Sequence, residues 1–366
     1  MAYGTINADV IGTSVANTSL GAGNASIMKN RIINGAMVID QRNAGALTNP
    51  AVTATYYLDR WLAASIVASK YSIGQNAGSV TPPAGFTNYL GCTSLSAYSP
   101  TGSDNFNIQQ RIEGYNVADL GWGTADAKTV TLSFWVYSSL TGTFGGSLRN
   151  SASSRSYPYS YTISSANTWE QKSITIAGDT TGTWLTTNGT GIVLLFSLGA
   201  GSTISGTAGA WAAGNYVSAT GATSVVGTSG ATFYITGVQL EVGSSATGFE
   251  YRQYGQELAL CYRYCQNMLL TVGQVGGLTG MNQTTTATFF TVQNAFRATP
   301  TSTYSGGLNV ISGNTPSPVT SVNNTYFNRT SATVSLICSG ATWTAGYAAN
   351  LYGLTTDGYL LLSAEL

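Results

Sequence analysis

The sequence predicts an all-β protein whose body is an antiparallel β-sandwich of the jelly-roll type. Short runs alternate apolar and polar residues with a period of two, the period of a strand with one buried face. Glycine-containing turn clusters, such as residues 177–182 and 220–223, separate these runs. Many short strands with no helices between them favour antiparallel sheets packed face to face.

We expect four parts along the chain. Residues 1–30 are rich in alanine, glycine, serine and asparagine without a sustained period, which predicts an extended N-terminal arm that becomes ordered on a partner. Residues 31–252 form the β-sandwich, 253–270 a short helical linker, and 271–366 a β-rich C-terminal tip. The 366 residues suffice for more than one domain of about 100 to 200 residues.

The clearest predicted strand is the segment 129–137. Its apolar side chains fall on one face, and its hydroxyl and aromatic side chains fall on the other. The predicted buried set is Val130, Leu132, Phe134 and Val136. Similar runs in the body cover residues 106–112, 157–163, 171–176, 192–198 and 232–240, and those in the tip cover 288–292 and 332–337. The apolar closing stretch, 359–366, is expected to be tied into a sheet or a subunit interface.

One stretch has helical character. From Gly255 to about Met268, several residues are apolar and no glycine interrupts the run after Gly255. We therefore expect a helix there, between body and tip. No exact internal repeat is visible, which argues against a solenoid or propeller.

Charged residues are scarce in this chain. They make up 8% of the sequence, against about 25% in an ordinary domain, while the hydrophobic share is 43%. The surface therefore consists of hydroxyls, amides and glycine, which suit pairing with sugars or with sister chains. With 14 basic and 14 acidic residues and no histidine, the chain lacks a basic stripe for phosphates, so we expect no nucleic-acid partner.

We expect neither membrane insertion nor an export signal. The longest apolar run, residues 192–196, is far shorter than the roughly 20 residues of a spanning helix. The first residues lack a basic flank followed by an apolar stretch.

Four cysteines are too few and too scattered for a disulfide framework. Cys261 and Cys265 would share one face of a helix, but zinc normally takes four ligands and no histidine is present. We expect buried free thiols at these positions and at Cys92 and Cys338, with no metal and no cofactor.

Several passages carry a resemblance to a known family. Residues 30–43, NRIINGAMVIDQRN, resemble the opening of a widespread family of bacteriophage tail-fibre and related tail structural proteins. Further passages match in the expected order. They are 57–61 (YLDRW), 110–114 (QRIEG), 132–136 (LSFWV), 235–243 (ITGVQLEVG), 249–252 (FEYR), 257–264 (ELALCYRY), 297–300 (RATP) and 364–366 (AEL).

The resemblance implies a virion protein of the phage tail. Its sandwich would be similar to carbohydrate-binding modules, and the chain would assemble as a homotrimer. The arm would dock on the baseplate or another tail protein, and the tip would contact host polysaccharide or lipopolysaccharide. The apolar arm residues assigned to docking are Tyr3, Ile6, Val10 and Ile11.

Nothing in the sequence indicates catalysis. A glycosidase usually needs two carboxyl groups about 5 to 10 Å apart, and no persuasive pair is visible. We expect structural ion pairs with arginines at Asp59, Glu113, Glu241 and Glu250, which lie in the resembling passages. The absence of histidine removes the usual base for a serine or cysteine nucleophile.

Tryptophans are the candidate sugar platforms. The chain has 7 tryptophans and 22 tyrosines, and the alternative role for each is to fill the core or a subunit contact. We assign that alternative to Trp61 and Trp135. For the tip we predict a receptor-binding aromatic cluster, with trimer packing as the equal alternative. Its members are Trp343, Tyr347, Tyr352 and Tyr359.

Asp179 lies in the turn Gly-Asp-Thr-Thr-Gly at residues 178–182. A Ca²⁺ site with nearby carbonyl oxygens is one reading of this turn. A lone aspartate in a turn more often accepts a hydrogen bond from the backbone two residues later, and we predict that role.

The predicted function is host attachment by a phage tail fibre. The alternatives are a purely structural tail or baseplate component and a polysaccharide-degrading tailspike. A bacterial secreted carbohydrate-binding module is disfavoured because no signal peptide is visible.

The tip prediction is testable by substitution. Replacing Trp343 and Tyr347 with alanine should abolish adsorption to host cells and leave the trimer intact, because exposed aromatic rings contribute to binding without supporting the fold. Adsorption and oligomeric state are measured on the same preparation. Unchanged adsorption would remove both residues from the site.

Overall fold

The computed structural model describes residues 28–366, apart from short segments of the tip. The segments left out are 270–272, 279–285, 293–295, 305–306, 313–314, 328–331, 339–348 and 354–358. Several tip strands are described by their backbone alone. The docking residues assigned to the arm, Tyr3, Ile6, Val10 and Ile11, lie outside the described residues, so that assignment stays a prediction.

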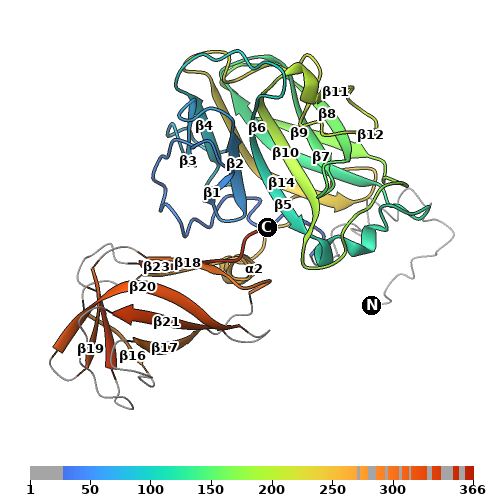
Figure 1. Ribbon diagram of the computed structural model, residues 1–366. Coiled ribbons are helices and arrows are strands. Elements are labelled where there is room, and N and C mark those ends of the chain that lie inside the picture. Colours follow the sequence, from blue (N-terminus) through green and yellow to red (C-terminus); the bar gives the residue numbers. More distant parts are fainter. Residues whose placement is uncertain are drawn as a thin grey trace, which may run out of the picture.

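Two antiparallel sheets form the sandwich (Figure 1). The seven-stranded sheet has the order β1-β2-β5-β10-β7-β8-β12, and the five-stranded sheet has the order β3-β4-β14-β6-β9. The first comprises β1 (Thr55–Leu58), β2 (Trp61–Ser65), β5 (Asn105–Glu113), β10 (Thr190–Ala200), β7 (Gly142–Arg149), β8 (Arg155–Ile163) and β12 (Ala212–Ala213). The second comprises β3 (Tyr71–Gln75), β4 (Leu90–Ser94), β14 (Thr232–Val242), β6 (Val130–Ser138) and β9 (Glu170–Ile176).

The core lies between these two sheets, as the alternating pattern predicts. Val130, Leu132, Phe134 and Val136 of β6 are all fully buried. Phe134 meets Phe196 of β10 edge to face, with ring centroids 5.0 Å apart, so the two sheets are joined by aromatic contact. Each buried aromatic ring removes about 150 to 250 Å² from water, which makes such contacts the main source of stability.

Residues 201–219 cover part of the outer face of the seven-stranded sheet. The segment contains η4 (Ser202–Ile204) and two short parallel strands, β11 (Ser205–Gly206) and β13 (Ser218–Ala219). Ile204 and Val217 pack with Val193 and Leu195 of β10 in a small apolar cluster. This part of the sheet is therefore not open to solvent.

The tip contains two further sheets (Figure 1). The three-stranded sheet is β15 (Cys265–Leu269), β23 (Tyr359–Ser363) and β18 (Thr301–Tyr304). The six-stranded sheet is β16 (Gly273–Leu278), β22 (Ala349–Gly353), β19 (Leu308–Ser312), β20 (Thr315–Phe327), β21 (Ala332–Cys338) and β17 (Thr286–Val292). Because β23 pairs with strands on both sides, the expectation that the closing stretch is tied into a sheet is confirmed.

The predicted helix is shorter than expected. Helix α2 spans Tyr254–Tyr262, and the expected helical residues beyond it form strand β15 instead. The turn is closed by a hydrogen bond from the Tyr264 amide to the Cys261 carbonyl, 2.8 Å. Pairing with β23 then supplies the backbone partners that a longer helix would have supplied, so tertiary contact decides the conformation of residues 265–269.

The four cysteines are buried free thiols, as predicted. Burial raises the pKa of each thiol, which keeps it protonated and unreactive at neutral pH. Within the described residues, no helix is long and apolar enough to cross a membrane.

The last residues of the chain bind the sandwich through a buried carboxylate. The Glu365 side chain, 5% exposed, accepts hydrogen bonds from Arg42 at 3.1 Å and from Arg60, which is 1% exposed. Arg60 also donates to the Arg111 carbonyl, and its guanidinium lies 3.6 Å from the centroid of the Tyr264 ring. Burial alone would lower the pKa of Arg60, but Glu365, Tyr264 and the neighbouring acidic groups together outweigh it and the pKa is raised.

A second carboxylate fastens the end of α2 to the same part of the sandwich. Glu113, the last residue of β5, accepts hydrogen bonds from Arg263 at 2.6 and 2.8 Å and from the Tyr264 hydroxyl at 2.6 Å. Burial by itself would raise the pKa of Glu113, but these donors outweigh it and lower the pKa. We call the contacts made by Glu365 and Glu113 the joint.

The first described residues are fixed nearby. Glu250 accepts hydrogen bonds from the amides of Met28 and Asn30 at 2.6 and 2.7 Å. The Asn30 side chain donates to the Val238 carbonyl at 3.1 Å, and Arg252 donates to the Ile32 carbonyl at 3.1 Å. The passages that carry the family resemblance thus meet in space, and their polar residues hold the body together.

The joint makes a prediction for stability. Glu365→Gln leaves Arg60 buried without its counter-ion, so we expect the free energy of unfolding to fall by about 3 kcal/mol. Chemical denaturation followed by tryptophan fluorescence measures this change.

The matched control is Asp119→Asn, which removes an ion pair with Arg31 whose aspartate is 48% exposed. It should cost less than about 1 kcal/mol, because water already screens an exposed pair. Equal losses in the two variants would show that the joint is not a special source of stability.

Candidate functional site

The described members of the predicted tip cluster belong to different sheets. Tyr352 lies in β22 of the six-stranded sheet, opposite Asn309. Tyr359 begins β23 of the three-stranded sheet, opposite Leu269. Trp343 and Tyr347 lie outside the described residues. The receptor role of the four residues therefore stays a prediction.

Of the two tryptophans assigned to the core or to a subunit contact, Trp61 lies in the core, and for Trp135 the subunit contact stays a prediction. Trp61 is fully buried, and its indole N–H donates to the Asn34 carbonyl at 2.9 Å. Trp135 is only half-buried and lies on the outer face of the five-stranded sheet, beside Gly237. Its position follows from the alternation of β6, in which odd-numbered residues point away from the core.

Three other tryptophans meet at one end of the sandwich. Trp122, Trp184 and Trp211 contact one another edge to face, with ring centroids 4.8, 5.2 and 5.3 Å apart. Tyr157 of β8 adds a fourth ring, 5.2 Å from Trp211. They come from separate loops, which the sequence places far apart.

Every indole N–H in this cluster has an acceptor. Trp122 donates to the Lys128 carbonyl at 2.8 Å, Trp211 to the Ala177 carbonyl at 2.7 Å, and Trp184 to the Thr181 carbonyl at 3.2 Å. These bonds fix the orientation of the rings. The cluster can therefore offer flat apolar faces to a ligand, but no free indole donor.

Asp179 and Arg155 hold the loop that carries Trp184. Arg155 donates to both carboxylate oxygens of Asp179, at 2.6 and 2.8 Å, and the aspartate is 2% exposed. The carboxylate also accepts from the Thr181 amide at 3.3 Å, as predicted for an aspartate in a turn. Burial would raise the pKa of Asp179, but the hydrogen bonds from Arg155 and Thr181, together with the Arg155 charge, outweigh it and the pKa is lowered.

Gly182 is required in the loop that carries Asp179 and Trp184. It has φ of +77°, and a Cβ there would lie 2.6 Å from Cγ of Arg155. Any larger residue would push Arg155 away from Asp179 and strain the backbone.

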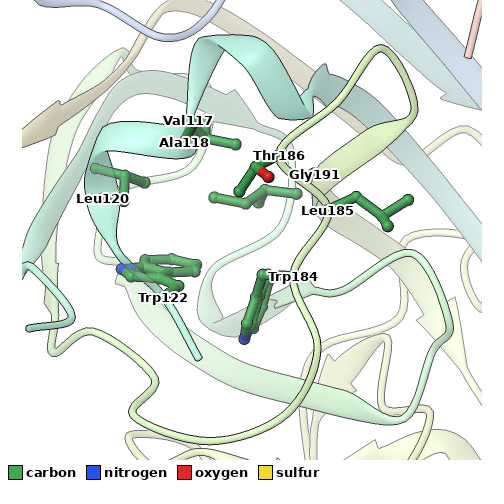
Figure 2. A pocket seen from close by; sticks show the side chains of 9 residues that line it. Val117, Ala118, Leu120, Trp122, Trp184, Leu185, Thr186 and Gly191 are labelled. Carbon is green, nitrogen blue, oxygen red and sulfur yellow. The ribbon is translucent and has the colours of Figure 1, made fainter. Parts of the chain in front are cut away.

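Figure 2 shows the cavity beside the cluster, with Trp122 and Trp184 at one end and Val117 and Ala118 at the other. Val117 and Ala118 border the short turns η2 (Gly114–Asn116) and η3 (Ala118–Leu120). The cavity volume is about 10 Å³, close to the space of one water molecule. A sugar ring cannot enter it, so a saccharide has to lie on the surface outside.

That surface is apolar and partly exposed. Trp184 and Trp211 are half-buried, Leu185 is 38% exposed and Tyr115 is 60% exposed. The Tyr115 amide donates to the Thr187 carbonyl at 2.9 Å, which ties the two loops together. We call the exposed parts of Tyr115, Trp184, Leu185 and Trp211 the end surface.

The sequence prediction for four carboxylates is partly corrected. Glu113 and Glu250 do pair with arginines, Arg263 and Arg252. Glu241 instead accepts from the Gln239 amide and from Thr247.

Asp59 likewise accepts from Gln41, at 2.5 and 2.7 Å, and forms no ion pair with any residue that the structure describes. Burial raises the pKa of Asp59 to about 6. Among the described residues, no group of three or more cysteine, aspartate or glutamate side chains is arranged to hold a metal.

The end surface could not be found from the sequence. The sequence predicts tryptophans as possible sugar-binding platforms, but residues 115, 184 and 211 share no motif that would place them together. The one local signal is that they lie in or beside glycine-containing turns.

Comparisons by sequence give no relative. No protein-family model matches the chain, and no curated protein matches it.

Comparison of folds finds sandwich domains of low similarity. The bacteriophage CBA120 tailspike protein 4 enzymatically active domain matches with 14% identity and a TM-score of 0.30, over 59% of this chain and 22% of the tailspike chain. The module TmCBM61 in complex with β-1,4-galactotriose matches with 9% identity and a TM-score of 0.28, over 58% and 99% of the two chains.

The family 11 carbohydrate-binding module of Lic26A-Cel5E from Clostridium thermocellum matches with 12% identity and a TM-score of 0.26, over 56% and 99%. The present chain thus spans about a fifth of the tailspike domain and nearly all of each module. None of these matches carries an argument about function.

The ion pair between Asp179 and Arg155 gives a prediction for the pH dependence of stability. Asp179→Asn removes the charge that balances Arg155, so we expect the free energy of unfolding at pH 7 to fall by about 2 to 3 kcal/mol. Because the folded pKa of Asp179 is lowered from 3.8, its contribution is present above about pH 4 and is lost below it. Wild type should therefore lose stability more steeply than the variant below pH 4.

The control is Asp126→Asn, an exposed aspartate in a loop at the same end. It should change the free energy of unfolding by less than about 0.5 kcal/mol. Parallel pH profiles for wild type and Asp179→Asn would contradict the prediction.

Proposed function

We propose that this chain is a bacteriophage tail fibre that attaches the virion to glycans on the host surface. The observation that carries the proposal is the end surface, where rigid tryptophan rings are exposed on a sandwich whose surface is otherwise neutral and polar. The sequence resemblance to tail-fibre proteins supports the viral assignment.

Sugar rings have an apolar face of C–H groups and an equatorial rim of hydroxyls. Half-buried Trp184 and Trp211 offer flat surfaces to that face, and their fixed orientation means little side-chain entropy is lost on binding. Threonines at positions 183, 186 and 187 are exposed beside the rings and present hydroxyls to the rim.

Attachment would depend on avidity. A few contacts to neutral hydroxyls are weak, but three copies on one fibre make the later contacts intramolecular and raise overall affinity by about 10² to 10⁴. We therefore propose a homotrimer, with the arm docked on the baseplate or another tail protein. The tip would supply further receptor contacts through its predicted aromatic cluster.

A purely structural tail component is the second candidate. The observation that favours it is the joint, since the polar residues of the resembling passages serve to hold body and tip together. Such a component would bind other tail proteins and no glycan.

The first experiment measures binding of the labelled full-length protein to host cells before and after periodate oxidation of surface glycans. We expect saturable binding that oxidation abolishes. Binding that resists oxidation would indicate a protein receptor. Absence of binding would favour the structural component. Since we propose attachment without catalysis, purified protein should release no reducing ends from host polysaccharide.

The end surface is tested by Trp184→Leu and Trp211→Leu, which keep apolar volume but remove the flat ring. Each should weaken glycan binding about 10-fold, about 1.4 kcal/mol. The matched control is Trp169→Leu, a half-buried tryptophan next to the five-stranded sheet. An equal effect of all three variants would remove the end surface from the site.

A further inference from the structure

The loop between β9 and β10, residues 177–189, carries Trp184 and Leu185 of the end surface. The body holds this loop from one side. The Gly114 amide of η2 donates to the Gly189 carbonyl at 2.8 Å. A Cβ at Gly114 would lie 2.4 Å from the Leu185 carbonyl oxygen, so η2 packs directly against the backbone of the loop. Any shift of the loop therefore moves part of the end surface.

Arg297 of the tip holds the same loop from the other side. Its Nε and Nη2 atoms donate to the Asn188 carbonyl at 2.9 and 2.6 Å. The Asn188 side-chain amide donates back to the Arg297 carbonyl at 3.2 Å. Asn188 precedes Gly189, and a Cβ at Gly189 would lie 3.0 Å from Cδ1 of Leu185. The residue that Arg297 holds is thus next to the backbone on which Leu185 rests.

The guanidinium of Arg297 also binds the end of the chain. Its Nη1 atom donates to the carbonyls of Ala364 and Glu365 at 3.1 and 3.2 Å. The Arg297 amide donates to the Arg263 carbonyl at 3.0 Å. The side chains of Glu365 and Arg263 both belong to the joint. One residue therefore connects the loop of the end surface to the joint.

Carbonyl oxygens are the partners that Arg297 uses. Among the described residues, none of the ion pairs includes it. Burial lowers the pKa of Arg297, because the guanidinium has exchanged water for these carbonyls. A planar guanidinium donates in several fixed directions at once, whereas a lysine ammonium is a point charge on a flexible stem. The arrangement requires the fork of an arginine and not only its charge.

We propose that Arg297 is a positioning residue of the end surface and couples the affinity of that surface for glycan to the joint between body and tip. This inference rests on the proposed glycan attachment. A loop that is already held in place need not be ordered when a saccharide binds, which favours tighter binding. Because coupling between two sites is reciprocal, glycan at the end surface would in turn strengthen the joint.

The first test uses the full-length protein without glycan and measures hydrogen exchange of the Gly114 and Tyr115 amides, which donate to the loop. Arg297→Gln should speed their exchange about 10-fold, equal to about 1.4 kcal/mol, because the loop then opens locally more often. The control is Ile73→Val, which deletes one methylene from the core and should leave this local exchange unchanged. Unchanged exchange in Arg297→Gln would overturn the proposal.

Two further variants separate the bridge from the charge. Arg297→Lys keeps the charge but cannot bond residues 188, 364 and 365 together, so its amides should exchange as fast as those of Arg297→Gln. Glu365→Gln loosens the joint and should speed the same amides in the wild-type background, but add little in Arg297→Gln. Full rescue by lysine, or additive effects of the two glutamine variants, would contradict the coupling.

The second test measures binding of the labelled full-length protein to untreated host cells. Arg297→Gln should bind about 10-fold more weakly than wild type, and Ile73→Val should bind like wild type. Equal binding by wild type and Arg297→Gln overturns the coupling. Wild-type binding that is absent, or that survives periodate, is a failure of the proposed function, and hydrogen exchange then still decides whether Arg297 positions the loop.

Discussion

The buried carboxylate of Glu365 is the contact on which the arrangement of body and tip depends. It lies between Arg42 and Arg60, and Arg60 in turn lies against Tyr264 at the end of the α2 segment. A buried ion pair adds little net stability, but removing one partner leaves an uncompensated charge, so the interaction is specific for one geometry. Because Glu365 lies two residues after the end of β23, the central strand of the three-stranded sheet is held to the sandwich.

Charged residues are scarce in this chain, and several of the acidic ones lie in ion pairs near the joint. In a chain with 14 acidic and 14 basic residues, Glu113, Glu250, Glu257 and Glu365 are used in buried or half-buried pairs near the joint. The passages that resemble tail-fibre proteins therefore supply contacts that hold the fold together. Under the proposed function, the glycan contacts would come from the end surface, which lies outside those passages.

The end surface illustrates how a candidate site departs from the needs of the fold. At the end surface, hydrogen bonds hold the tryptophan rings rigid while part of their area stays exposed, although a core would have buried them. This arrangement forgoes stability that a purely structural protein would use.

Sequence alone determined the fold class, six strands of the sandwich and the buried face of β6, because a period of two is local and a run such as 130–136 shows it directly. It also located α2, but not the end of that helix, which pairing with β23 decides. Only the tertiary structure joined Arg60 to Glu365 across 305 residues and brought together three tryptophans from different loops. Strand order sets these neighbours, and no local pattern records which strands will lie side by side.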